Sequence, residues 1–479
     1  MSYTVAQNTS FLTIASVLQK AVSFVYFTII ARLIGVENTG VYFFAIAFTS
    51  IFSVVADFGL ASVLTRELAK DQGRSQSYVN TILWSKIIFG LVAYALVAVA
   101  VNILNYPTIF KDLVYLSGIT MFFDNLHMVF YSVFRAHRNL VYEAIGLVGS
   151  QILTLIIGTV ALFGGGALYW LILAYAIPAV INAAYAGFFA RRKFALRFSF
   201  YFDRAVFKLF FLMAVPFALA GIITRLYAYS DSLIMSKLLS AQELGYWSVP
   251  YKITFAFQFI PMALSASIYP AFSAFFGGDA SKISELFAKS WRYLFTVVFP
   301  LSAGIIILAR PAIHLLYTKN YDASVPVLQI LMISLIFIFL SFVTGAFLNA
   351  TNRQSTQTAL MAGALAVNLT CNTILIPRLG IMGAAISALT SNFILWLSGF
   401  IVARRITHID GGRIIKYFAQ TFVPALIMAV VVYYAVSRLH FIWTIPLGAA
   451  VYFVLLFATG GLSVSLVKEK LKILNFKKL

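Results

Sequence analysis

Residues 221–252 read GIITRLYAYSDSLIMSKLLSAQELGYWSVPYK, and this stretch decides the fold. It predicts the second half of an apolar helix, a short polar turn and the start of another helix. Arg225, Asp231 and Lys252 nevertheless lie inside the apolar runs. A charge at the centre of a membrane helix costs about 2.5–3.5 kcal/mol on insertion scales, so these charges need a functional or structural reason.

The composition of the whole chain indicates a membrane protein. Hydrophobic residues make up 62% of the 479 positions and charged residues 10%. A soluble fold of this length would leave much of that apolar surface in water, so we predict an all-α polytopic membrane protein. The single cysteine, Cys371, excludes a disulfide within the chain, and neither a metal site nor a cofactor is expected.

A helix needs about 20 apolar residues to cross the membrane, and by this criterion the sequence predicts fourteen transmembrane helices. Their expected ranges are about 11–31, 40–62, 80–103, 113–134, 141–163, 167–189, 209–234, 243–272, 291–309, 325–348, 357–376, 382–403, 417–437 and 441–462. Pro250, Pro261 and Pro270 predict kinks or breaks in the eighth. Residues 199–208 are expected to lie as an amphipathic segment on the membrane surface.

The net charge of +20 is distributed as an orientation signal. Basic runs such as ARRKFALRF (190–198), ARRITHIDGGRIIK (403–416) and KEKLKILNFKKL (468–479) all fall on one side of the predicted membrane. By the positive-inside rule that side is cytoplasmic, which places both termini there. The basic runs are therefore expected to contact membrane lipids, and nucleic acid is not an expected partner.

An internal repeat divides the chain. ARLIGVENTGVY at 31–42 aligns with SKLLSAQELGYW at 236–247, at an offset of 205 residues. Six helices per copy bring both copies into the membrane in the same sense, with the substrate path expected near mid-membrane between them. We therefore predict two pseudo-symmetric six-helix lobes, 1–198 and 199–406, followed by two extra helices and a basic cytoplasmic tail in 407–479.

Three cations are candidates for binding an anionic substrate. The same offset brings Lys20 onto Arg225, so each lobe has one cation at about the same depth. Both suit a phosphate group in a water-filled cavity, although a structural ion pair with an intramembrane acid is the alternative. Lys252 is either a third cavity cation or a side chain that snorkels to the surface.

Five further charged or titratable residues are candidates for coupling or gating. Asp231 could gate the cavity, bind a coupling cation or pair with a cation on another helix, and Asp124 and His127 share a helical face at mid-membrane. Asp57 and Arg66 form either an inner-gate ion network or a helix-end pair.

Asn368 and Asn372 share a helical face and point either into the cavity or against another helix. The sequence contains none of the common catalytic or phosphate-binding motifs, and the connecting loops are short, so an enzyme is not predicted.

The order of several motifs resembles a known family. ARLIGVENTGVY, DFGLASVLTRELA (57–69), DSLIMSKLLSAQELGYWSVPYKI (231–253) and NLTCNTILIPRLGIMGAAISA (368–388) are similar to the polysaccharide or O-antigen flippases of the multidrug/oligosaccharidyl-lipid/polysaccharide exporter superfamily. The resemblance implies an alternating-access transporter of a bacterial plasma membrane. It would move a polyprenyl-pyrophosphate-linked oligosaccharide, such as an O-antigen unit for lipopolysaccharide, to the outer leaflet.

The resemblance leaves open the coupling ion, the protein partners and several rival functions. H⁺ or Na⁺ is a candidate coupling ion, and polysaccharide polymerase machinery is a candidate partner. Rival functions are a lipid II flippase, a multidrug cation antiporter, which should have an acidic cavity, and a membrane polysaccharide polymerase or ligase.

Overall fold

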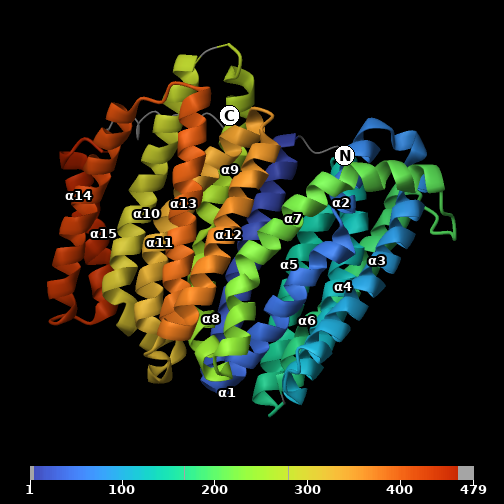
Figure 1. Ribbon diagram of the computed structural model, residues 1–479, viewed down its shortest axis with the longest axis horizontal. Helices are drawn as coiled ribbons and strands as arrows, with labels where there is room; N and C mark the ends of the chain where they lie inside the picture. Colours follow the sequence, from blue (N-terminus) through green and yellow to red (C-terminus); the bar gives the residue numbers. More distant parts are fainter. Residues whose placement is uncertain (1–4, 167, 279, 462–479) are drawn as a thin grey trace. The chain divides into compact units, whose positions relative to one another are not determined.

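The computed structural model describes residues 5–166, 168–278 and 280–461, so the basic tail predicted after residue 461 lies outside the described residues (Figure 1). Throughout these ranges the regular structure is helical, without strands. The elements are α1 (Val5–Asp57), α2 (Leu60–Lys70), η1 (Gln72–Arg74), α3 (Ser75–Ile103), α4 (Thr108–Ala136), α5 (Val141–Phe163), α6 (Leu168–Phe194), α7 (Arg204–Leu238), α8 (Ala241–Phe257), α9 (Phe259–Phe275), α10 (Ala280–Tyr317), η2 (Lys319–Tyr321), α11 (Ser324–Ala350), α12 (Gln354–Leu379), α13 (Ile381–Ile406), α14 (Gly411–Val436) and α15 (Phe441–Ala458).

The described residues contain thirteen helical segments long and apolar enough to cross a membrane, which confirms the polytopic prediction. The first of them, Phe11–Lys70, is 60 residues long. That corresponds to about 90 Å, three times the thickness of the hydrocarbon layer. Gly35 breaks it with φ 80° and ψ 173°, and the chain reverses there (Figure 1). Counted as two crossings, this segment brings the total to the predicted fourteen.

The two copies of the sequence repeat show the same local structure. The break at Gly35 and the end of α7 at Leu239–Ser240 fall at equivalent positions of the repeat. A Cβ added to Gly40 would overlap the carbonyl oxygen of Ala241, and one added to Gly245 would overlap that of Val36. Because Val36 is the repeat equivalent of Ala241, and Gly40 of Gly245, the contact is self-complementary, as expected around a two-fold axis.

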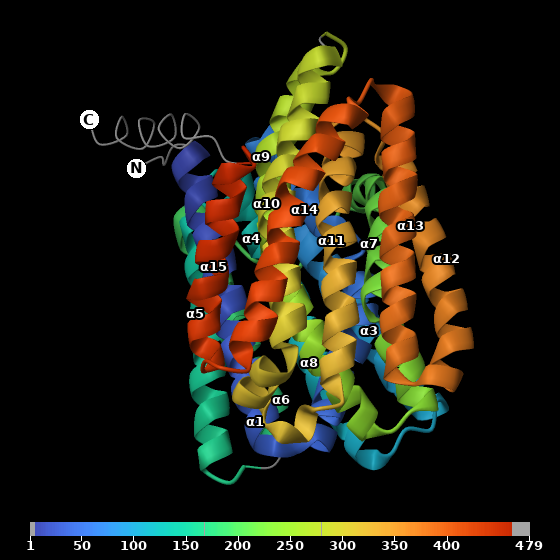
Figure 2. The ribbon, with the colours of Figure 1, turned by 90° about the vertical axis from the view of Figure 1, so that its left-hand side faces the viewer.

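Two compact units make up the packing of the chain. The first runs to Lys252 and includes 369–384, and the second contains 253–368 and the residues from 385 onward. α7 and the start of α8 therefore pack with the first six predicted helices. The lobe boundary at 198 is a boundary of the sequence repeat, and it stays a prediction. In the second unit, α10 lies beside both α11 and α14 (Figure 2).

Proline and amphipathic patterning explain the local irregularities. α8 and α9 are separated at Gln258, three residues before Pro261, which has no N–H to bond the carbonyl of Phe257. In α7, Pro216 lies inside the helix, which changes direction along its length in Figure 1. Residues 199–203 of the predicted amphipathic segment have no regular structure, and α7 begins at Arg204.

The core of the first unit lies at the end of the bundle near α2. Leu60, Leu64 and Leu68 follow one face of α2 and are fully buried. They belong to an apolar cluster with residues of α3, α4, α6 and α7. This cluster fixes the end of α1, where the polar site begins.

Candidate functional site

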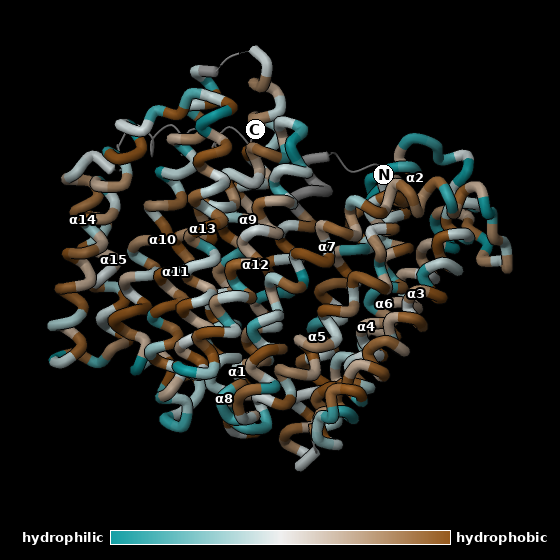
Figure 3. Tube along the Cα trace, in the orientation of Figure 1, coloured by the Kyte–Doolittle hydropathy of each residue, from teal (hydrophilic) through white to brown (hydrophobic). Residues whose placement is uncertain are grey.

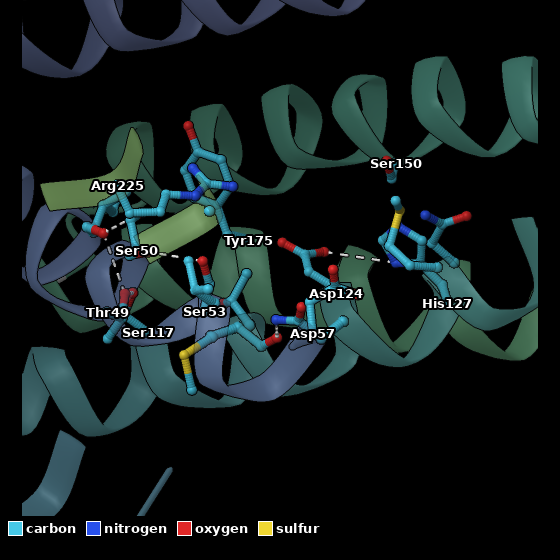
Figure 4. Close-up of a pocket in the computed structure, with 18 of the residues that line it drawn as sticks. Thr49, Ser50, Ser53, Asp57, Ser117, Asp124, His127, Ser150, Tyr175 and Arg225 are labelled. Atoms are coloured by element: carbon cyan, nitrogen blue, oxygen red, sulfur yellow. Dashed lines mark hydrogen bonds and ion pairs between the residues drawn. The ribbon is translucent and has the colours of Figure 1, made fainter. Parts of the chain in front are cut away.

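A cavity of about 600 Å³ lies inside the first unit, among α1, α2, α4, α5, α6 and α7 (Figure 4). Its lining is rich in hydroxyl, amide and charged side chains, which is unusual for the interior of an apolar helical bundle. The polar lining residues are Gln19, Thr49, Ser50, Ser53, Asp57, Ser62, Ser117, Thr120, Asp124, Asn125, His127, Ser150, Tyr175, Asn182 and Arg225.

Four of the residues predicted from the sequence converge on this cavity. Asp57 comes from the end of α1, Asp124 and His127 from α4, and Arg225 from α7. Arg225 and His127 lie toward opposite ends of the pocket drawn in Figure 4, with Asp124 and Asp57 between them. The lining therefore carries both signs of charge.

Asp124 and His127 form the contact that their spacing predicts. Asp124 Oδ1 lies 3.8 Å from His127 Nδ1 (Figure 4). The Asp124 side chain is 54% exposed although it lies at mid-helix, because it faces the cavity, whereas His127 is buried. A cavity-facing carboxylate beside an imidazole can accept a proton or a small cation from the water in the cavity.

The other predicted cations take different positions. Lys20 is half-buried on α1, next to Gln19, which lines the cavity. The Lys252 ammonium lies 5.3 Å from the centre of the Phe27 ring, so an aromatic face on α1 stabilises it.

Asp231 forms a hydrogen bond with a side chain of another helix. It is buried and accepts a hydrogen bond from Asn372 Nδ2 of α12. In the second unit, Asn368 Nδ2 donates to Ser391 Oγ at 3.4 Å. Both asparagines therefore connect helices, as the alternative of packing against another helix predicts.

The prediction that Asp57 and Arg66 form a helix-end pair is wrong. Arg66 is exposed on α2 and pairs with Glu67 at 2.9 Å, whereas Asp57 pairs with Lys86 of α3 at 2.6 Å. The helix is interrupted at Phe58 and Gly59, which both have positive φ, so α2 does not continue the axis of α1. Asp57 and Arg66, which are nine residues apart, therefore do not lie on one continuous helix.

Lys86 is a buried charge next to the candidate site that the sequence analysis did not single out. Its side chain is completely buried, and its ammonium donates to the carbonyl of Asn125 at 2.8 Å as well as pairing with Asp57. The signal was present, because Lys86 lies within the predicted span 80–103 in the apolar run TILWSKIIFG. It connects the end of α1 and the interior of α4 to α3, at two residues that line the cavity.

The hydroxyl groups in the wall bond to one another or to their own helices. Thr49 Oγ1 and Ser117 Oγ lie 2.7 Å apart, and Ser50 Oγ donates to the carbonyl of Ile46 at 2.7 Å. A serine that donates to a backbone carbonyl still has acceptor lone pairs to offer. The cavity can therefore accept hydrogen bonds from a hydroxyl-rich ligand, while Arg225 donates to an anionic one.

Comparison with known proteins gives a consistent group of matches. The family model described as "Polysaccharide biosynthesis protein" matches residues 5–276, and the MatE model matches residues 216–374. The capsular polysaccharide biosynthesis protein CapF of Staphylococcus aureus is 21% identical over 404 residues, which cover 84% of this chain and 99% of CapF. The lipopolysaccharide biosynthesis protein WzxC of Escherichia coli is 23% identical over 338 residues, covering 67% and 64% of the two chains.

Solved structures share the fold. The lipid II flippase MurJ in an inward closed conformation matches with a TM-score of 0.77 at 16% identity, covering 93% of this chain and 97% of MurJ. An inward-facing multidrug resistance transporter of the MATE family and MOP superfamily matches with a TM-score of 0.68 at 13% identity, covering 81% and 94%. At these identities the structural matches establish the fold, and the family model covers more than half of the chain.

Proposed function

Because this chain belongs to the polysaccharide biosynthesis protein family of the multidrug/oligosaccharidyl-lipid/polysaccharide exporter superfamily, we propose that it flips a polyprenyl-pyrophosphate-linked oligosaccharide across a bacterial plasma membrane. The observation that carries the proposal is a polar cavity within an apolar bundle, with Arg225 among hydroxyl and amide side chains. A pyrophosphate needs cationic donors, and sugar rings need many hydrogen-bonding groups. The cavity offers both.

In this proposal the substrate headgroup enters the cavity and the prenyl chain stays in the lipid. Arg225 binds a phosphate oxygen, and Lys20 and Lys252 supply the remaining positive charge as the headgroup moves. The lobes alternate in access to the two sides of the membrane. The substrate drives this change only if it binds the two conformations with different affinity.

Coupling to H⁺ or Na⁺ is assigned to the acidic end of the cavity. Asp124 faces the cavity beside His127, so it can exchange a cation with the water there. Asp231 stays a candidate for gating or coupling because it is a buried carboxylate on the same helix as Arg225. Asp57 is less suited, because Lys86 already neutralises it at 2.6 Å. Arg66, exposed on α2, is retained only as a gating candidate.

The decisive experiment is transport of a fluorescent lipid-linked oligosaccharide in proteoliposomes. Lys20→Ala plus Arg225→Ala is expected to reduce the initial rate at least ten-fold, because two phosphate-binding cations are lost. Arg353→Ala plus Arg438→Ala is the matched control, since it also removes two positive charges but from exposed turns after α11 and α14. Normal transport by a correctly inserted Lys20→Ala plus Arg225→Ala variant would contradict the proposal.

A multidrug cation antiporter is the rival that a specific observation favours. Asp124 is a cavity-facing carboxylate that could bind an organic cation, and the MatE model matches residues 216–374. A fluorescent cationic dye in the same proteoliposomes separates the two functions. Dye efflux driven by an ion gradient, lost in Asp124→Asn and unaffected in Arg225→Ala, would favour the antiporter.

Two other rival functions differ from the proposed one, the first in the sugar that the transported lipid carries and the second in being an enzymatic reaction. A lipid II flippase would transport labelled lipid II in preference to other pyrophosphate-linked oligosaccharides. A polymerase or ligase would change the size of the glycan on the lipid, which chromatography of the recovered lipid detects. An unchanged glycan found in the opposite leaflet is the result that the flippase proposal expects.

A further inference from the structure

A nine-residue segment between α6 and α7, residues 195–203, is fastened to α3. We call it the strap. The N–H of Arg197 donates to Gln76 Oε1 at 2.9 Å, Asn80 Nδ2 donates to the carbonyl of Arg197 at 3.1 Å, and Trp84 Nε1 donates to the carbonyl of Ser199 at 2.9 Å. Gln76, Asn80 and Trp84 are four residues apart and share one face of α3. The backbone of the strap is therefore held in place by side chains.

The strap presents aromatic side chains outward. Phe198, Phe200, Tyr201 and Phe202 are all exposed, Phe200 to 91% of its surface. The Phe200 ring nevertheless stacks on Trp84 with 3.8 Å between ring centres. Several adjacent exposed aromatic rings on a fixed backbone are typical of a surface that contacts another molecule or a membrane.

Trp84 connects the strap to the lipid-facing side of α3. Further along that helix, Ile88, Leu91, Val99 and Ile103 expose more than half of their surface. In a membrane-spanning helix such residues face the acyl chains. In Figure 3, α3 is mostly brown along its length, and teal gathers near its start and α2. The strap therefore lies where the apolar face of α3 ends, at the level where Tyr and Trp rings such as those of Tyr201 and Trp84 gather at a membrane interface.

The surface around the strap is strongly basic. Residues 191–208 contain six exposed cations, which are Arg191, Arg192, Lys193, Arg197, Arg204 and Lys208. Asp203 is the one acid in this range, and its Oδ1 accepts the N–H groups of Ala205 and Val206 at 2.8 and 3.2 Å. That carboxylate is engaged in capping α7. The positive charge of the six basic side chains therefore remains available to attract an anionic ligand.

We propose that the strap and its basic neighbours bind the headgroups of anionic phospholipids in the adjacent leaflet. The charge requires an anionic partner, and the continuity of Phe200 with the lipid-facing side of α3 places that partner in the bilayer. A soluble acidic protein or a nucleic acid would leave the aromatic rings without an apolar environment. The surface lies outside the cavity, so this proposal does not depend on the transported substrate.

Native mass spectrometry of the full chain tests the proposal. The delipidated protein is titrated with phosphatidylglycerol or with phosphatidylcholine of the same acyl chains. The wild type is expected to retain phosphatidylglycerol preferentially. Arg197→Gln plus Arg204→Gln should reduce its retention about thirty-fold, since each of the two basic residues near an anionic surface contributes about 1 kcal/mol.

Arg378→Gln plus Arg438→Gln is the matched control, because it removes two exposed charges from connections that the positive-inside rule places on the opposite side of the membrane. The strap contacts to Arg197 involve its backbone, so the strap variant should unfold at the wild-type temperature. Equal losses in both variants, or undiminished lipid binding by the strap variant, would overturn the proposal. Loss of a co-purifying acidic protein without loss of lipid would also overturn it.

Discussion

At the residue scale, the ion pair between Asp57 and Lys86 connects the cavity wall to α3. Lys86 is completely buried, so its ammonium depends on Asp57 and on the carbonyl of Asn125 for stabilisation. Asp57 is the last residue of α1, immediately before the break at Phe58 and Gly59. Loss of either charge leaves the other without its partner, because the apolar bundle offers little solvation.

We expect Asp57→Asn and Lys86→Met to be destabilising as single substitutions and mutually compensating as a pair. Each single variant should lose about 3 kcal/mol, the low end for a broken buried pair, because Asp57 remains 31% exposed to the cavity. The double variant leaves no unpaired charge and should recover most of that loss. Thermal unfolding in detergent measures this, and additive losses in the double variant would contradict the pairing.

A second residue-scale prediction concerns Asp124. Asp124→Asn keeps the size of the side chain but removes its charge, so transport should lose its dependence on the coupling cation. Asp322→Asn is the control, because Asp322 pairs with Arg310 and His314 outside the cavity. Initial rates measured with and without an ion gradient provide the test. A full gradient response in Asp124→Asn would remove Asp124 from the coupling role.

At the element scale, close helix contact depends on two glycines related by the repeat. Gly40 on α1 and Gly245 on α8 each face the backbone of the other helix, so neither position has space for a Cβ. The neighbouring atoms are backbone atoms, which cannot move aside as a flexible side chain can. The approach of α1 to α8 therefore requires glycine at both positions.

Gly40→Ala and Gly245→Ala are expected to separate α1 from α8 and to lower the unfolding temperature by several degrees, with a loss of transport. Gly363→Ala is the matched control, because Gly363 lies inside α12 with nothing within 4 Å of the added Cβ. That variant should be as stable as the wild type or slightly more stable, since alanine favours a helix. Wild-type stability and transport of Gly40→Ala would contradict the close contact.

At the scale of the whole molecule, the distribution of basic residues predicts the orientation in the membrane. The chain has one cysteine, so Cys371→Ser gives a background without reactive thiols. In that background, Gln72→Cys should be protected from a membrane-impermeant maleimide in intact cells and labelled after permeabilisation. Ser437→Cys should be labelled in intact cells, because the positive-inside rule places it outside. The reverse pattern would invert the predicted topology.

The sequence by itself determined the helical membrane fold, the repeat and four residues of the cavity. Hydrophobic length and repeated spacing are local properties, so they identified the crossings and the equivalence of Gly40 and Gly245. Burial of charge in an apolar run likewise marked Arg225, Asp57, Asp124 and His127. These signals need no knowledge of which helices are neighbours.

Only the tertiary structure decided which charges meet. Asp57 pairs with Lys86 rather than Arg66 because the helix is interrupted at Phe58 and Gly59, which both have positive φ, and helical periodicity does not predict this interruption. The strap is fastened to α3 by residues more than one hundred positions away in the sequence. Ion pairs and hydrogen bonds depend on distances of a few ångströms between helices, and those distances follow from packing rather than from spacing along the chain.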